Sequence, residues 1–363
     1  MTNKWFTCFA VVSLLFFVES GGSKTAAQDD PTHLRVNVVL VQLNVAITDD
    51  KGNYITGLKP EDFAVTEDKI PQKISTFEES TESGHSAMEA VRRDQPHSSG
   101  IAAASADADP SLATSSAAGV TISHLTDANV FVLFDTSNYM YRSFVFAQDA
   151  IADFIRSMDE SSKVAFYSYS RNLSRATNLT SDHFRIVNGV RSTVAGDDAA
   201  LYNSLLLTVK DAAPLKGRKA IVVFSNGPDN ASSVPPEDVA ELAQSTGTII
   251  YIISTRQAQD DPVSAAAFER MSKVSGGKAY FAKNWREEKQ AFASIREDLV
   301  HLYTLSYYPQ ANPNRGWRSI HVKLLGKDLQ KYHIRTRDGY RLLPVTALPS
   351  EEFTSRANDA GSK

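Results

Sequence analysis

Cysteine is almost absent from this sequence. Its 363 residues include one cysteine, Cys8, which lies inside an apolar N-terminal stretch. A single cysteine cannot form an internal disulfide. We therefore expect no disulfide framework, no thiolate metal site and no cysteine nucleophile in the folded part of the protein.

An excess of charge of either sign is also missing. The 38 basic residues nearly balance the 42 acidic ones, for a net charge of −4. Nucleic-acid binding needs a concentrated basic surface, so this balance argues against nucleic acid as the main partner. The composition is typical of a soluble globular protein, and the length suffices for two ordinary domains.

Long apolar runs are limited to the N-terminus, where Trp5–Val18 follows the basic Lys4 and precedes small and polar residues. This run is shorter than the roughly 20 residues of a membrane-spanning helix. The pattern predicts a signal peptide over residues 1–28, cleaved after Ser20 or near Ala27. The alternative is an uncleaved anchor. No later run is long enough to span a membrane, so we expect an exported mature chain, periplasmic or secreted, without a transmembrane span.

Two segments far apart in the sequence have the alternation of half-buried strands. In the first, Val41, Leu43, Val45 and Ile47 alternate with mostly smaller or polar residues, and residues 64–77 suggest another strand. In the second, Ile320, Val322 and Leu324 alternate with polar residues, as do Tyr332 and Ile334. Each segment alone offers too few strands for a stable fold. We therefore expect residues 29–79 and 302–345 to build one small β-sandwich.

Residues 125–301 alternate short apolar runs with helical patterns, as in an α/β fold. Phe144, Ala147, Ile151, Phe154 and Met158 have the spacing of a helix with one buried face. Such alternation predicts a Rossmann-type, mostly parallel sheet with helices on both faces, inserted in the sandwich. Between the two lies a segment rich in Ser, Ala, Gly and Asp, residues 80–124, which we interpret as a flexible linker. Residues 346–363 are predicted to be a disordered tail.

Three polar loops are expected at the same edge of the parallel sheet. They are Asp135–Tyr139 and Ser225–Asn230, which follow predicted strands, and Gly196–Tyr202, which lies between them in the sequence. In open parallel sheets, ligands bind at the carboxyl ends of the strands. This edge is therefore the candidate site.

Several motifs occur in an order that resembles that of the von Willebrand factor A-related domain proteins of the acidobacterial type. The resemblance runs from residue 34 to residue 343. Its motifs are Leu58–Phe63, the loop beginning at Asp135, Gly217–Lys219, Ser225–Asn230, Ser275–Gly277, Tyr303–Tyr308 and Arg335–Tyr340. The resemblance implies a von Willebrand factor A-like fold and is weaker support for any one function.

Members of that family hold Mg²⁺ or Mn²⁺ in a metal-ion-dependent adhesion site, built from Asp-x-Ser-x-Ser, a Thr and a further Asp. The resemblance places Asp135 and Ser137 at the first two of these positions. The other three are altered, because Tyr139 replaces the second Ser, Ala199 the Thr and Asn226 the Asp. One carboxylate is thus lost from the site.

This degenerate site has two interpretations. In the first, it binds no metal, and Asp135 and Ser137 hold the turn or cap the following helix. In the second, it binds Mg²⁺ or Mn²⁺ weakly through Asp135, Ser137 and the amide oxygen of Asn226, with a substitute carboxylate. The candidates for that carboxylate are Asp197, Asp198 and Asp229, which ordinary turn chemistry would also explain.

The resemblance implies a binding function, and the sequence contains no His-Glu-x-x-His or Gly-x-Ser-x-Gly motif. We expect no enzyme but a module that binds an unidentified protein through these loops. Tyr139, Tyr141 and Tyr202 are candidates for the contact surface, or else pack beneath the loops. One alternative is a structural scaffold of an envelope or secreted assembly that binds through the β-sandwich. Another is a metal-dependent hydrolase.

Overall fold

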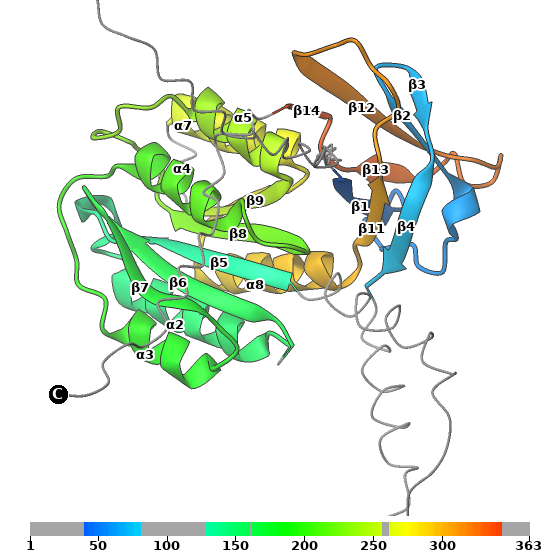
Figure 1. The fold of residues 1–363 in the computed structure, drawn as a ribbon. Helices are drawn as coiled ribbons and strands as arrows, with labels where there is room; N and C mark the ends of the chain where they lie inside the picture. The colour runs from blue at the N-terminus through cyan, green and yellow to red at the C-terminus, as the bar shows by residue number, and fades with distance from the viewer. Residues whose placement is uncertain (1–39, 81–127, 160, 256–260, 343–363) are drawn as a thin grey trace, which may run out of the picture. The chain divides into compact units, whose positions relative to one another are not determined.

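The structure, a computed structural model, describes residues 40–80, 128–159, 161–255 and 261–342 (Figure 1). The predicted signal peptide and tail lie outside these residues, as does the predicted linker apart from Ser80. The domain boundaries proposed from the sequence there remain predictions.

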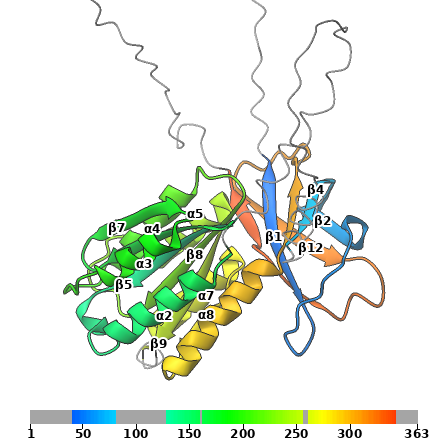
Figure 2. The same cartoon turned by 90° about the horizontal axis from the view of Figure 1, so that it is seen from below.

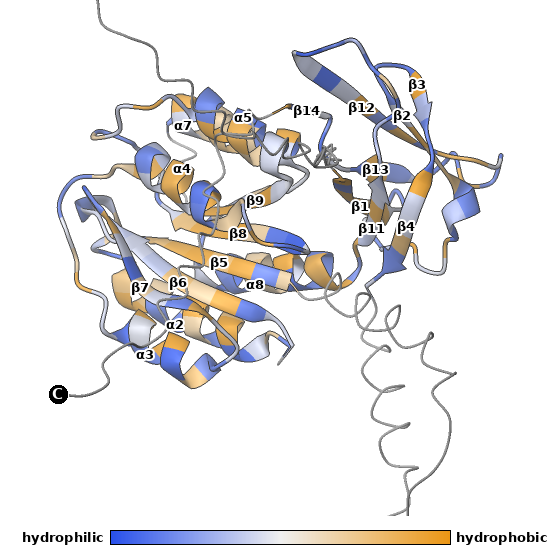
Figure 3. Cartoon of the chain, viewed as in Figure 1, coloured by the Kyte–Doolittle hydropathy of each residue, from blue (hydrophilic) through white to orange (hydrophobic). Residues whose placement is uncertain are grey.

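A six-stranded sheet forms the centre of the α/β part, in the order β10-β9-β8-β5-β6-β7. All neighbouring strands are parallel except β7, which pairs antiparallel with β6 at the edge. The inner strands are almost wholly apolar because helices cover both of their faces (Figure 3). The strands are β5 (Ala128–Asp135), β6 (Lys163–Tyr169), β7 (Leu173–Thr180), β8 (Arg218–Ser225), β9 (Thr248–Thr255) and β10 (Ala279–Ala282).

Helices cover the two faces of this sheet in two groups, each with its own buried apolar core. One face carries α2 (Phe144–Ser157), α3 (His183–Arg191) and α8 (Trp285–Val300), and α2 lies beside α8 (Figure 2). The other carries α4 (Leu201–Ala212), α5 (Pro236–Thr246) and α7 (Pro262–Ser275). The predicted α/β fold is confirmed. The sequence analysis did not identify β7 and α3.

Two four-stranded antiparallel sheets enclose a third apolar core. Each sheet combines strands from both ends of the chain, which confirms the predicted β-sandwich. One has the order β13-β1-β11-β4, with β1 (Val41–Thr48), β4 (Ile74–Glu79), β11 (Tyr303–Tyr307) and β13 (His333–Arg335). The other has the order β14-β12-β2-β3, with β2 (Phe63–Glu67), β3 (Ile70–Gln72), β12 (Trp317–Leu324) and β14 (Gly339–Arg341). A 3₁₀ turn, η1 (Pro60–Asp62), precedes β2.

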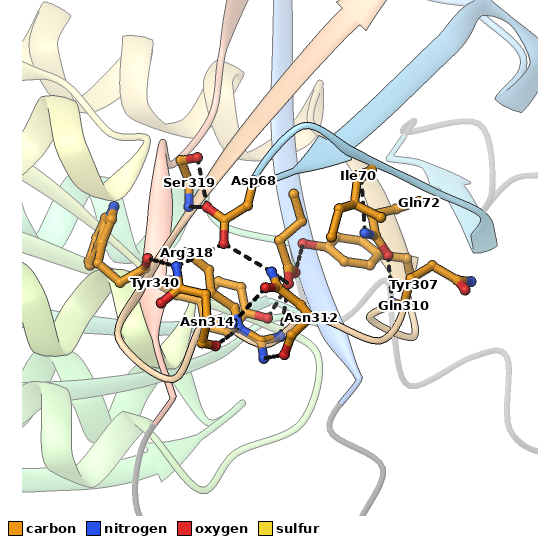
Figure 4. Close-up of polar contacts among 12 residues, drawn as sticks. Asp68, Ile70, Gln72, Tyr307, Gln310, Asn312, Asn314, Arg318, Ser319 and Tyr340 are labelled. Atoms are coloured by element: carbon orange, nitrogen blue, oxygen red, sulfur yellow. Dashed lines mark hydrogen bonds and ion pairs between the residues drawn. The ribbon is translucent and has the colours of Figure 1, made fainter.

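The single strand predicted over residues 64–77 was wrong. The chain turns back at Asp68 and Lys69, which both have positive φ, so that β2 and β3 form a hairpin. Two consecutive residues with positive φ match the twist of a tight hairpin. Asp68 holds this turn by accepting hydrogen bonds from Asn312, Asn314 and Ser319 (Figure 4).

A buried ion pair lies beside this hairpin. Glu67, fully buried, accepts hydrogen bonds from the Tyr307 hydroxyl and the Tyr340 hydroxyl, both at 2.9 Å. The Arg318 guanidinium donates to the same carboxylate at 2.8 Å. A buried charge needs such partners, because leaving it unpaired is costly.

The α/β part is inserted between two neighbouring strands of the sandwich. β4 precedes it and β11 follows it, and these strands pair with Glu79 opposite Tyr303. Buried polar contacts join the two parts. Asp298 of α8 accepts hydrogen bonds from Tyr54, from Tyr251 of β9 and from Arg335 of β13. This cluster of four residues, which we term the Asp298 junction, links both ends of the chain to the central sheet.

Candidate functional site

The three predicted loops meet at the carboxyl edge of the central sheet. The Gly196 amide donates to the Thr136 carbonyl at 2.7 Å, and the Asn138 amide donates to the Asp197 carbonyl at 2.8 Å. The Ala199 amide donates to the Asn230 side chain at 2.8 Å. These bonds connect the loop after β5, the segment before α4 and the loop after β8, as the strand order predicts.

Asp135 is the fully buried carboxylate at the centre of this edge. One of its oxygens accepts from the Ser137 amide at 2.9 Å, and the other accepts from the Ser225 hydroxyl at 2.8 Å. The Tyr169 hydroxyl donates in turn to Ser225. Burial raises the pKa of Asp135, while these hydrogen bonds act in the opposite direction.

The two other predicted metal ligands differ in their hydrogen bonding. The Ser137 hydroxyl is buried and makes no hydrogen bond of normal geometry within the described residues, but it lies close enough to Asp135 to lower the pKa of that carboxyl. Asn226 is buried, and its amide nitrogen donates to the Tyr139 carbonyl. Its amide oxygen accepts from the Thr255 hydroxyl at the end of β9. Asn226 therefore links the ends of β5, β8 and β9.

The three candidate substitute carboxylates do not converge on Asp135. Asp229 accepts hydrogen bonds from the Tyr202 amide at the start of α4 and from the Ser232 amide, so it organises a turn. Asp198 pairs with Arg171 at 3.6 Å. Asp197 is exposed, and its carboxylate lies 3.5 Å from the Tyr141 hydroxyl.

These donors fit a hard divalent cation poorly, because Asp135 is the one carboxylate that the described residues bring to this position, and a lower ligand charge weakens the binding of such an ion. Both oxygens of Asp135 accept hydrogen bonds within the protein, and the amide oxygen of Asn226 accepts one from Thr255, so a cation would compete with these bonds. The Ser137 hydroxyl adds a single neutral ligand. No group of three His, Cys, Asp or Glu side chains suited to a metal occurs in the described ranges.

The three candidate tyrosines lie in different surroundings. Tyr141 is half exposed, and its hydroxyl donates to the Gly196 carbonyl at 2.9 Å. Tyr139 is partly buried. Tyr202 packs against the apolar core under α4, and burial raises its pKa to about 12. Of the two possibilities given for these tyrosines, contact surface or packing beneath the loops, the surroundings of Tyr202 match packing beneath the loops.

The same edge carries exposed apolar side chains that the sequence analysis missed. Five residues, which we term the loop rim, are each half exposed or more, namely Tyr141, Val145, Phe146, Val263 and Trp285. They follow the carboxyl ends of β5, β9 and β10, in a loop or in the first turn of a helix. Val145 and Phe146 fall outside the predicted buried stripe of α2, a signal that could have identified them.

Comparison with known proteins places the α/β part in a family. The sequence model of the von Willebrand factor type A domain matches residues 129–294. No curated protein matched the chain.

Solved structures with a similar fold include several bacterial proteins. The conserved hypothetical protein BatB from Bacteroides thetaiotaomicron is 14% identical, with a TM-score of 0.41, over 47% of this chain and 97% of that one. The vWF domain of the type V pili tip protein Mfa5 from Porphyromonas gingivalis is 11% identical, with a TM-score of 0.41, over 47% of this chain and 94% of that one. The von Willebrand factor type A protein from Catenulispora acidiphila is 10% identical, with a TM-score of 0.42, over 58% of this chain and 66% of that one. By the family match and the sheet topology, residues 129–294 form a von Willebrand factor type A domain.

Proposed function

We propose that this protein is a non-catalytic module that binds a protein partner at the carboxyl edge of its central sheet, without a metal ion. The loop rim is the observation that carries this proposal. Single exposed apolar residues are ordinary on protein surfaces, but a concentration of them at one edge favours an interaction site. The match to the von Willebrand factor type A domain supports a role as a protein-interaction module.

The hydrogen bonds around Asp135 support binding without a metal ion. Its hydrogen bonds to the Ser137 amide and the Ser225 hydroxyl hold the loop after β5 in place. Asn226 secures the same loop through the Tyr139 carbonyl. The polar residues of the candidate metal site would thus hold the loop rim in position, and the loop rim would contact the partner.

The proposal includes export. It is supported by the apolar run after Lys4 and the small residues that follow. Among the residues that the structure describes, no helix combines the length and the apolar character needed to cross a bilayer.

The test measures which proteins the wild type and three variants capture from an envelope extract, once with a chelator and once with Mg²⁺. Val145→Ser with Phe146→Ser removes apolar surface from the rim. Phe184→Ser is the matched control, since Phe184 is at least as exposed as Val145 and Phe146 but follows the antiparallel β7 at the opposite edge. Leu325→Ser tests the sandwich, where Leu325 is half exposed.

We expect the wild type and Phe184→Ser to enrich the same proteins, with or without chelator, and the rim variant to lose them. Retention of every captured protein by the rim variant would refute the proposal. Loss only in Leu325→Ser would favour the scaffold alternative. Loss of capture with chelator would show that the binding depends on metal after all.

A further inference from the structure

A pocket of about 400 Å³ is lined by residues of the β6–β7 hairpin and by residues at and just after the end of α3. Its volume falls in the range of small-molecule sites. Thr136 and Ser168 contribute to its lining from the ends of β5 and β6, and Ser174 from β7. Val194, after α3, contributes from the opposite side.

Small side chains create this space. Ser168 and Ser174 are direct partners in the β6–β7 ladder, and Ala176 follows on the same strand. Gly189 of α3 also lines the pocket, and a methyl group there would lie 2.3 Å from the Thr177 hydroxyl. Glycine is therefore required at this position, because it lets α3 approach the β6–β7 hairpin closely.

The lining is rich in hydroxyl groups and carries no charged side chain. Arg171, which lies between two lining residues, has its guanidinium near Asp198 at 3.6 Å. The hydroxyls of Thr136, Ser192 and Thr193 donate to backbone carbonyls. Within the described part of the chain, the side chains of Ser168, Ser174 and Asn172 make no hydrogen bond to protein. Their hydrogen-bonding capacity is therefore available to a ligand.

We propose that this pocket binds a neutral saccharide of one or two sugar rings. A hydroxyl group is both a donor and an acceptor, so sugar hydroxyls can pair with serine hydroxyls in either sense. They can replace the hydrogen bonds of displaced water, which an apolar ligand cannot do. None of the lining side chains would provide an opposite charge for an ionic ligand. Val194, 80% exposed, provides an apolar surface for the ring carbons.

The experiment follows ¹³C-labelled alanine and valine methyl groups of the purified protein by NMR. The probes are maltose, cellobiose, lactose and chitobiose, with glucuronate as the charged comparison and a serine-rich peptide as the polypeptide comparison. Val194 and Ala176 report on the pocket, and Val263 on the rim. We expect at least one neutral disaccharide to shift the Val194 methyl groups saturably and to leave Val263 unchanged.

Two variants at exposed positions of β7 test the location. Ala176→Trp fills the pocket and should abolish the shifts of Val194. Ser174→Ala removes one hydrogen-bonding group and should weaken binding about fivefold, which corresponds to about 1 kcal/mol. The rim variant, Val145→Ser with Phe146→Ser, should bind the saccharide as the wild type does, so this proposal and the proposed function can fail separately.

Three results would overturn the proposal. The first is the absence of a saturable Val194 shift with every neutral disaccharide. The second is binding of glucuronate or the peptide at least as tight as that of the best disaccharide. The third is unchanged saccharide affinity in Ala176→Trp, whose methyl spectrum shows whether it is folded.

Discussion

Replacing Arg335 with methionine should strongly destabilise the protein, because it leaves the Asp298 carboxylate buried without its counter-charge. Asp298 is fully buried, and the Arg335 side chain is 20% exposed. Tyr54 and Tyr251 would remain as neutral donors. Methionine keeps much of the apolar stem of arginine, so the change removes the charge more than the packing.

Removal of one partner from a buried ion pair typically costs about 3–5 kcal/mol. Arg335 is partly exposed and two tyrosines still donate to Asp298, so we expect a loss near the lower end, about 3 kcal/mol. The double variant with Asp298→Asn removes both charges and should recover part of this loss, since no unpaired charge remains.

Urea unfolding followed by tryptophan fluorescence measures the change in each part of the fold. Trp285 reports on α8 in the α/β part, and Trp317 reports on β12 in the sandwich. To separate the two fluorescence signals, Trp5 is replaced in every variant, and each variant keeps either Trp285 or Trp317. In the wild type we expect the two transitions to coincide, and in Arg335→Met we expect both midpoints to fall.

The matched control is Arg341→Met, which breaks the ion pair between Arg341 and Glu241. Both of these side chains are nearly half exposed, so the loss should be below about 1 kcal/mol. If Arg335→Met cost no more than this control, the Asp298 junction would not stabilise the fold as described. A loss confined to one tryptophan signal would refute the coupling of the two parts.

Three further predictions concern single side chains. Burial raises the pKa of Asp135, so the folded state binds its proton more tightly than the unfolded state, and the wild type gains stability as pH falls through the folded pKa. Asp135→Asn lacks this titration, so urea titrations at successively lower pH should show the free energy of unfolding of the wild type rising relative to that of Asp135→Asn. Gly277→Ala would place a methyl group 1.9 Å from the Ile250 carbonyl oxygen, and calorimetry should show a loss of at least about 2 kcal/mol. Glu67→Gln leaves the buried Arg318 guanidinium without a counter-charge, and urea unfolding should show a loss of about 3 kcal/mol, whereas a loss below 1 kcal/mol would contradict the assigned pairing.

Apolar periodicity predicted the framework of this fold because burial imposes it directly. The buried face of α2 contains Ala147, Ile151 and Phe154, as the spacing indicated. Strand alternation and the small number of strands at each end predicted the shared sandwich. The carboxyl-edge position of Asp135 and Asn226 followed from the strand order alone.

Features that depend on side-chain direction could not be predicted in the same way. The sequence does not show that the amide of Asn226 connects Tyr139 with Thr255, because that contact depends on how three strand ends align. The pairing of Asp298 with Arg335 is another example. A charged residue in an amphipathic helix usually faces solvent, and Asp298 is buried because Tyr54, Tyr251 of β9 and Arg335 of β13 all pack against it.

The most direct test of the central claim is site-specific photo-crosslinking in cells. A photoreactive phenylalanine analogue at position 146 reports on the loop rim, and the same analogue at position 184 reports on the opposite edge. We predict a defined crosslinked product from position 146, unchanged by a metal chelator, and none from position 184. Equal products from both positions, or loss of the position 146 product with chelator, would contradict metal-independent binding of a partner at the carboxyl edge.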